Sequence, residues 1–339
     1  MSTASQPAQV SQTNRRNLFY GIFSIVLAGV LLYFSLRGVE WRRVWDTIQH
    51  ADWLYLGIAC LITCCSFFLR ACRWRVLLNA SARFSIGTVF GATMAGYLGN
   101  SFLPARAGEF IRSYIIGSRS NLSKTYVLTT ALSERMVDAI VLVLASSVAL
   151  LGVEHTPSWL AGVSRTTAIV AGAGLLAIAI LPHTGSLVEQ VLQKLPMPSG
   201  LRIRLAAFAE QIISGLRTFH SVGRLAGFAA FTAVIWTFDC FTAMAGARSL
   251  GIALSFPVAL LLITAIGLGS ALPSTPGYVG IYQFVTVSVL TPFGIEHDRA
   301  LAYSFVSQAV GYVVVLALGL PALYSIKDWR NAIRDNSAA

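Results

Sequence analysis

The stretch SFLPARAGEFIRS, residues 101–113, decides the fold because it places a group of charges directly after an apolar, glycine-containing run. Arg106, Glu109 and Arg112 follow one another at helical spacing within this short segment. Charged side chains are costly beside hydrocarbon, so such a cluster is typical of a wet cavity or a buried ion cluster in a membrane protein. Pro104 ends the preceding apolar helix, because proline cannot continue the helical hydrogen bonds. The chain is therefore expected to turn here rather than cross the bilayer.

The composition is that of an integral membrane protein. Of the 339 residues, 55% are hydrophobic and only 12% are charged, far from the balance of a soluble domain. Apolar runs of about 20 residues, long enough to span a bilayer, occur at 18–36, 53–72, 84–103, 125–153, 159–182, 225–247, 255–275 and 300–325. We predict one membrane domain over 18–326, with a disordered N-terminal tail over 1–17 and a cytoplasmic C-terminal tail over 327–339, of which the segment NAIRDNSAA (331–339) is expected to be disordered.

The distribution of basic residues indicates which runs cross completely. If every run were a full span, lysine and arginine would fall on both sides, against the usual cytoplasmic excess. The cytoplasmic excess of basic residues is restored if 84–103 turns back to the side of the membrane from which it enters. The run 255–275, with the short run 281–293, must then do the same from the opposite side. We therefore predict an all-α protein with about six full transmembrane helices, two oppositely oriented re-entrant hairpins and both termini in the cytoplasm.

A weak internal repeat supports these hairpins. The segments LGNSFLPARAG (98–108) and LGSALPSTPG (268–277) share their Leu-Gly, Leu-Pro and Pro-x-x-x-Gly elements. Matching Gly/Pro-interrupted segments on opposite sides of a membrane are typical of inverted-repeat transporters, whose site lies between the two broken segments. The alternative is that glycine and proline simply end two helices and that the likeness is accidental.

The first hairpin supplies candidate binding residues. Arg106 is expected near the start of a helix whose open N–H groups, together with its planar guanidinium, suit a phosphate or carboxylate. Glu109 and Arg112 are spaced to pair on that helix, Asn100 precedes the turn as a further polar candidate, and Gly108 breaks the chain. The other interpretation is that these arginines snorkel to the membrane surface.

The segment LSERMVDAI (132–140) places three ionisable residues inside a predicted span. Glu134 and Asp138 lie four apart and share a helix face, and Arg135 is close enough to Asp138 to pair with it. Such groups are expected to line the protein interior or a wet cavity. A direct role with substrate and a structural ion cluster both remain open. Asp239 is a lone acid and a weaker candidate.

The second hairpin, ALPSTPGYVGIYQF (271–284), is rich in chain breakers. Irregular backbone at membrane depth is tolerated only where it is buried or faces water, which favours a cavity wall. The predicted breakers are Pro273, Pro276, Gly277 and Gly280, and Gln283 is the predicted binding residue.

Taken in order, RACRW, GNSFLPARAGEFIR, ERMVD and PSTPGYVG resemble the flippase-like transmembrane domain of the lysylphosphatidylglycerol synthase family, over essentially the whole chain. The resemblance implies a lipid-translocating module, which in full-length bacterial members precedes a soluble aminoacyl-transferase domain. Matched to the family motifs are Arg106, Glu109 and Arg112, then Glu134, Arg135 and Asp138, and finally Pro276, Gly277 and Gly280.

Two departures from the family pattern affect what can be carried over. The chain ends at Ala339, so we expect no soluble transferase domain and no lysyl transfer. Tyr278 follows Gly277, and Gln283 stands at a position where the family has a glutamate, which puts any ion coupling through that position in doubt.

The predicted function is flippase-like translocation of an anionic lipid, or of a lipid-linked headgroup, across a bacterial inner membrane. The alternatives are a small-solute transporter of the same type and a scaffold for a separate transferase or glycosyltransferase. The formal charge of +11 points to anionic lipid headgroups rather than nucleic acid, because the basic residues flank membrane runs. The five histidines fall in loops or at interfaces, and no acid/base constellation is evident. We therefore expect no enzyme activity, no cofactor and no metal.

Overall fold

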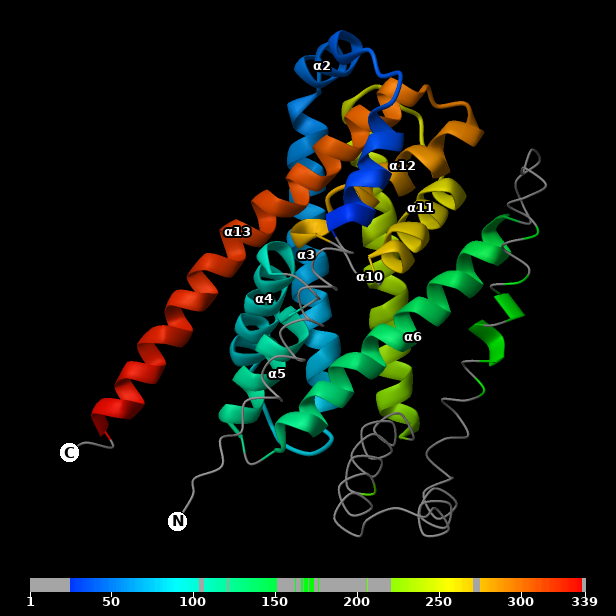
Figure 1. Cartoon of the computed structure of the whole chain (residues 1–339). Coiled ribbons are helices and arrows are strands. Elements are labelled where there is room, and N and C mark those ends of the chain that lie inside the picture. Colours follow the sequence, from blue (N-terminus) through cyan, green and yellow to red (C-terminus); the bar gives the residue numbers. More distant parts are fainter. Residues whose placement is uncertain are drawn as a thin grey trace, which may run out of the picture.

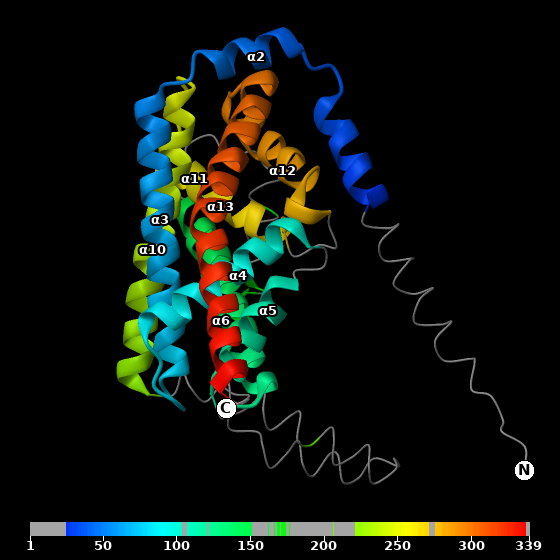
Figure 2. The same ribbon diagram turned by 90° about the vertical axis from the view of Figure 1, so that its left-hand side faces the viewer.

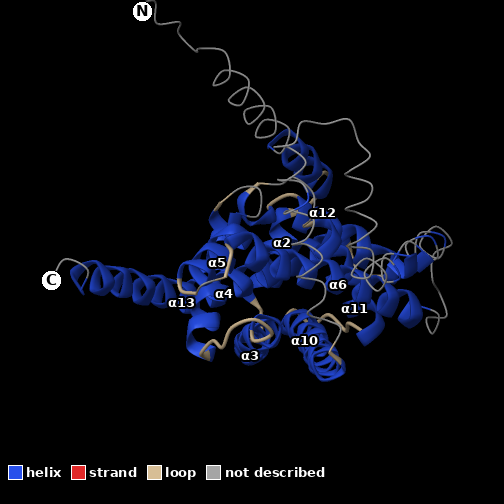
Figure 3. Cartoon of the chain, turned by 90° about the horizontal axis from the view of Figure 1, so that it is seen from below, coloured by secondary structure: helices blue, strands red, loops and turns tan. Residues whose placement is uncertain are grey.

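A computed structural model describes residues 25–103, 107–120, 122–150, a few short pieces between 162 and 206, 221–270 and 275–336. Pro104, Arg106, Pro273 and most of the predicted span 159–182 lie outside these residues. The elements within them are all helices joined by loops (Figure 3). They are the N-terminal helix Ile25–Leu36, α2 Trp41–Gln49, α3 Trp53–Leu78, α4 Ile86–Phe102, α5 Ala107–Ser118, α6 Lys124–Leu150, α10 Val222–Ser249, α11 Phe256–Gly269, η3 Pro276–Tyr278, α12 Ile281–Leu290, η4 Thr291–Phe293 and α13 His297–Asn336.

Three of the described helices are long and apolar enough to cross a membrane, namely α3, α10 and residues His297–Ser325 of α13. The protein is thus an integral membrane protein. The 27-residue α6 has sufficient length but carries Glu134, Arg135 and Asp138. Helix α13 continues to Asn336, so residues 331–336 extend a helix, whereas disorder was expected there from the polar sequence.

Helices α3 and α10 run side by side in opposite directions along one side of the bundle (Figures 1 and 2). The Asp52 N–H, just before α3, donates to the Ser249 carbonyl at the end of α10 over 2.8 Å. Asp52 also begins α3, because its side chain accepts from the Leu54 N–H, the usual N-cap bond. This pair supplies one wall of the site.

Helices α4 and α5 form a short antiparallel pair with unusually close backbones. A Cβ on Gly108 of α5 would lie 1.8 Å from the Gly96 carbonyl oxygen of α4. The Gly108 N–H donates to Asn100 Oδ1 over 2.9 Å, which satisfies one of the open donors at the start of α5. Glycine is required at position 108 because no side chain fits between the two helices.

A second short pair, α11 and α12, is joined through η3. Here the backbone of Gly277, Tyr278 and Gly280 adopts positive φ angles of 69°, 61° and 89°, a region in which non-glycine residues are uncommon. A Cβ on Gly277 would lie 1.7 Å from the Tyr312 hydroxyl and 3.2 Å from the Ser101 carbonyl oxygen of α4. The turn of the second pair therefore touches the end of the first.

The amphipathic helix α2 crosses one end of the bundle, where it packs against α13 (Figure 2). Trp41 and Trp45 are more than half exposed, and Val44, on the adjoining part of the helix surface, is buried. Exposed tryptophans at the end of membrane helices mark the level of the lipid headgroups. We take this end of the bundle as one membrane surface.

Candidate functional site

Arg73 of α3 lies at the centre of a buried ion-pair network. Its side chain is fully buried, and its guanidinium donates to both carboxylates of α6: to Glu134 Oε1 over 2.8 Å and to Asp138 Oδ1 over 2.6 Å. A third bond reaches Thr232 Oγ1 of α10 over 3.0 Å, and the Phe228 ring lies 4.8 Å from the guanidinium carbon. A planar guanidinium with several N–H donors can bind two carboxylates and a hydroxyl at the same time. One side chain thereby joins α3, α6 and α10.

Arg112 and Glu109 extend the network to α5. Arg112 Nη1 donates to Glu134 Oε2 over 3.1 Å, and Arg112 lies 2.5 Å from Glu109 Oε2, as the sequence spacing predicted. The guanidinium also stacks on the ring of Trp74, which is itself fully buried. With 3% exposure, Arg112 holds helices together at this point and is not open to the membrane surface.

Arg135 connects the network to a cavity. The sequence predicted a pair with Asp138, but Arg135 Nε donates to Glu109 Oε1 over 3.1 Å and Arg135 Nη2 to the Tyr97 hydroxyl over 3.3 Å. The reason is that Arg73 already occupies Asp138. With 24% of its side chain exposed, Arg135 is more accessible than Glu109, so it can meet a ligand without the network being dismantled.

Arg70 and Asp239 form a second ion pair between α3 and α10. Asp239 also accepts from the Ser66 hydroxyl over 2.6 Å, so it is not the isolated acid suggested by its sequence context. The Arg70 guanidinium lies 4.8 Å from the Trp236 ring centroid, and the Trp236 indole N–H donates to Asp138 over 3.3 Å. The indole therefore links this pair to the Arg73 network.

The two clusters balance their charges. They contain four arginines and four carboxylates, namely Arg70, Arg73, Arg112, Arg135, Glu109, Glu134, Asp138 and Asp239. Buried charges in a low-dielectric interior persist only when they are paired and hydrogen-bonded. The balance explains how a membrane domain accommodates so many ionised groups.

A cavity of about 380 Å³ adjoins these clusters. Its walls come from α3, α4, α6, α10, α11, η3, α12 and α13. The charged groups facing it are Arg70, Arg135 and Asp239, and its aromatic lining consists of Phe67, Tyr97, Trp236, Tyr278, Tyr282 and Tyr303. The lining thus carries a surplus of one positive charge. Guanidinium and hydroxyl donors in a largely apolar site are suited to an oxyanion.

Gln283 lies beside this cavity as part of an amide chain that fixes the second turn. It is 1% exposed, and its Oε1 accepts from the Gly280 N–H over 2.8 Å while its Nε2 donates to Gln308 Oε1 over 2.7 Å. Gln308 in turn donates to the Gly277 carbonyl, as does the Tyr312 hydroxyl. Both polar atoms of Gln283 are engaged by the protein itself.

The structure thus brings together most of the residues singled out in the sequence. Glu109, Arg112, Glu134, Arg135 and Asp138 form one network, Asn100 and Gly108 hold α4 to α5, and Pro276, Gly277, Gly280 and Gln283 build the second turn. The described residues include no group of three or more histidines, cysteines or acids placed to hold a metal ion.

The sequence interpretation missed Arg70, Arg73 and Trp74. These residues lie in RACRWRVLL (70–78), at the end of an apolar run, where arginine and tryptophan usually anchor a helix at the headgroups. Arg73 and Trp74 are instead fully buried, and Trp74 donates to Thr130 Oγ1 over 3.3 Å. The runs 125–153 and 225–247 together contain three acids, Glu134, Asp138 and Asp239, but only one arginine, Arg135. That imbalance was a signal for further internal cations.

The sequence model of the lysylphosphatidylglycerol synthase TM region matches residues 21–319. The chain belongs to this family. The match covers nearly all the described helices, including both clusters and the cavity, and it confirms the resemblance seen in the sequence motifs.

Two curated relatives extend the comparison. Glycosyltransferase AglD of Haloferax volcanii is 27% identical over 350 residues, covering 93% of this chain and 55% of that protein. The UPF0104 membrane protein PH1989 of Pyrococcus horikoshii is 23% identical over 325 residues, covering 88% of this chain and 93% of that protein. The chain therefore spans about half the length of the first relative and nearly all of the second.

The comparison corrects one expectation. The absence of an acid/base constellation led us to predict that the chain is not an enzyme, but AglD is named as a glycosyltransferase and matches 93% of this chain. The prediction that the chain is not an enzyme is therefore withdrawn. Family membership and this relative together suggest a lipid-related function in the membrane.

Proposed function

We propose that the lysylphosphatidylglycerol synthase TM region formed by this chain translocates lipids with an anionic headgroup. The observation that carries the proposal is the cavity of about 380 Å³ in which Arg135 and Arg70 face a single carboxylate, Asp239. A volume in the range of roughly 300–1,000 Å³ is typical of ligand sites. A phosphate-sized headgroup fits these donors, while the tails remain in the bilayer.

Arg135 is the residue best placed to receive the headgroup. It is held by Glu109 and Tyr97 but partly exposed, so an incoming phosphate oxygen can add to its bonds or replace one of them. Arg70 supplies a second cation, and the tyrosine hydroxyls at the cavity wall supply further donors. In this mechanism the headgroup exchanges its hydration shell for protein contacts, which lowers the cost of crossing hydrocarbon.

The arrangement of the short helices supports alternating access around this site. The α4–α5 and α11–α12 pairs act as two oppositely oriented re-entrant hairpins, whose ends meet where Gly277 lies against Ser101. We propose six full spans beside them, both termini in the cytoplasm and a bacterial type of inner membrane. Broken helices that meet near a midplane site are typical of inverted-repeat transporters.

A second candidate function follows from the relative named as a glycosyltransferase. In this proposal the cavity presents a lipid-linked substrate to a glycosyl-transfer reaction, carried out by this chain or with a separate transferase. Asp239 and the aromatic lining could then contact sugar hydroxyls and ring faces. Glycosyl transfer to membrane lipids from labelled sugar nucleotides, by the purified chain alone, tests this alternative.

Translocation is tested in liposomes carrying headgroup-labelled fluorescent phosphatidylglycerol or phosphatidylcholine, with dithionite quenching of the outer leaflet. We expect wild type to expose the inner pool of the anionic lipid, and Arg135→Gln to slow this about tenfold, the loss expected for one charge-assisted bond. Arg135→Lys should retain part of the rate. Arg83→Ala, which removes an exposed arginine, should behave as wild type.

Equal rates for wild type and Arg135→Gln would contradict the proposed role of the cavity. Equal rates for labelled lipid in protein-containing and protein-free liposomes would contradict translocation itself. Thermal unfolding of each variant in detergent provides the control for folding.

A further inference from the structure

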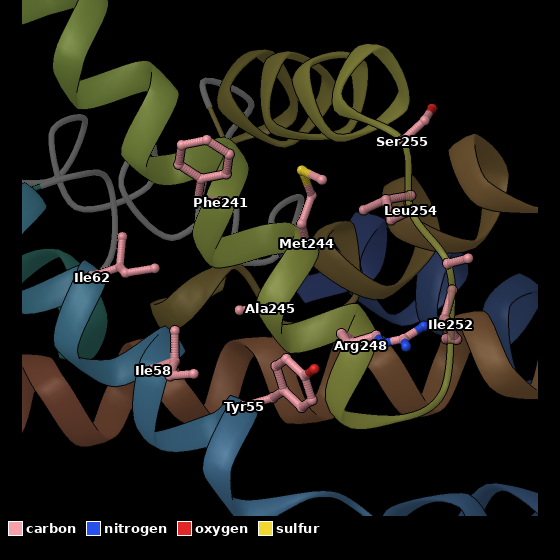
Figure 4. A pocket seen from close by; sticks show the side chains of 11 residues that line it. Tyr55, Ile58, Ile62, Phe241, Met244, Ala245, Arg248, Ile252, Leu254 and Ser255 are labelled. Carbon is pink, nitrogen blue, oxygen red and sulfur yellow. The ribbon is translucent and has the colours of Figure 1, made fainter.

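A second hollow lies on the α3–α10 pair, away from the central cavity. Its volume is about 650 Å³, and it lies between α3, α10 and the segment that follows α10 (Figure 4). Ile62 and Phe241 line it, whereas their chain neighbours Thr63 and Thr242 line the central cavity. Successive helical residues point about 100° apart, so the two sites occupy different faces of the same helices.

The lining of this groove changes from apolar to polar along its length. Ile62 and Phe241 lie at one end and Tyr55 and Arg248 at the other, because α3 and α10 are antiparallel. On each helix the two ends are seven positions apart, which corresponds to about 10 Å of helix. Figure 4 shows Tyr55 and Arg248 at the same end of the groove, with Ile58 and Met244 between the ends. The groove is therefore amphipathic along the membrane normal.

The polar end coincides with the membrane surface. Trp53, two residues before Tyr55, is 81% exposed, and the exposed tryptophans of α2 lie at the same end of the bundle. Arg248 is exposed in the last turn of α10, and no acidic side chain in the described part of the chain pairs with it. Arg248 thus lies at the level of the lipid headgroups, and the apolar part of the groove extends from it toward the membrane interior. An anionic phospholipid has the same order of groups, a charged phosphate followed by acyl chains.

We propose that this groove binds one anionic phospholipid as a resident lipid, separate from the lipid that is translocated. Its phosphate lies against Arg248 and the Tyr55 hydroxyl, and one acyl chain runs along Ile58, Ile62 and Phe241. The charge of Arg248 selects an anionic headgroup. The acyl chain packs against the apolar side chains of α3 and α10 that line the groove. The proposal goes beyond translocation and does not depend on it.

Native mass spectrometry of the full chain, titrated with dioleoyl phosphatidylglycerol or phosphatidylcholine, tests the groove. All proteins compared in this titration carry Arg135→Gln, so that lipid binding in the central cavity does not contribute to the signal. We expect Arg248→Ala to weaken phosphatidylglycerol binding about fivefold, the effect of one basic residue at the surface. Ala245→Phe fills the groove without changing the charge and should weaken binding to a similar degree.

The matched control is Arg42→Ala, which removes an exposed arginine of α2 outside the groove. We expect it to leave phosphatidylglycerol binding unchanged. An equal loss for Arg42→Ala and Arg248→Ala would overturn the proposal, because net charge alone would then explain the effect. Unchanged binding in Ala245→Phe would also overturn it, because no acyl chain would then occupy the groove. A negative result for the groove would not change the result expected for Arg135→Gln in the lipid-translocation assay, because the two sites are tested separately.

Discussion

Arg73 is the residue on which the buried network depends most. It neutralises Glu134 and Asp138 together and is fully buried. Arg73→Met should lower the free energy of unfolding by about 3–5 kcal/mol, because it leaves buried carboxylates without a partner. Thermal or denaturant unfolding in detergent, followed by tryptophan fluorescence, measures the loss. Arg83→Ala removes an exposed arginine and should change the stability by less than about 0.5 kcal/mol.

The double variant Arg73→Met with Asp138→Asn separates charge from packing. Removing one of the two facing carboxylates should return part of the lost stability, so the two changes should be less than additive. Strict additivity would contradict direct coupling between Arg73 and Asp138.

At this scale the sequence predicted the acids better than their partners. Glu134 and Asp138 stand out because ionised groups in an apolar run are rare and face inward. Arg73 does not stand out, because an arginine near the end of an apolar run is usually a headgroup anchor. Only the pairing across α3, α6 and α10 distinguishes the two cases, and such long-range contacts leave no local pattern.

At the scale of elements, the α4–α5 pair depends on glycine at specific positions. Gly108→Ala would place a methyl group 1.8 Å from the Gly96 carbonyl oxygen. Because the oxygen belongs to the backbone and a Cβ has no rotamer by which to move away, we expect the helices to separate and the protein to lose several kcal/mol of stability or fail to assemble. Gly91→Ala is the matched control in α4, where a Cβ meets nothing within 4 Å. It should be neutral or stabilising by up to about 1 kcal/mol, because alanine favours helix.

Melting temperatures of the two variants in the same detergent test this contrast. A Gly108→Ala protein as stable as Gly91→Ala would contradict the close approach of α4 and α5.

The breaks in these elements were predictable, and their packing was not. Pro104 and the glycines near 277–280 indicated where the apolar runs end, because proline and positive-φ glycine interrupt helices. The structure adds that the second break, at Gly277, lies against Ser101 and Tyr312. The helical continuation of α13 to Asn336 was not expected, since its polar sequence resembles that of a free tail.

At the scale of the whole molecule, the buried clusters are electrically neutral. The net charge of +11 therefore resides outside them, on loops and helix ends where it can attract anionic headgroups. Of these neutral clusters the cavity wall presents Arg70, Arg135 and Asp239, whereas Glu109, which pairs with Arg135, does not line the cavity. Surface charge and site charge thus favour the same class of lipid.

The most direct test of this account is photocross-linking with phosphatidylglycerol that carries a photoactivatable group on its headgroup. After irradiation in liposomes, mass spectrometry of the digested protein locates the adducts. We expect adducts on the cavity lining, at Tyr97, Tyr278 or Tyr282, and their loss in Arg135→Gln with unchanged labelling in Arg42→Ala. Adducts confined to residues outside the cavity in wild type would contradict the claim that the headgroup passes through it.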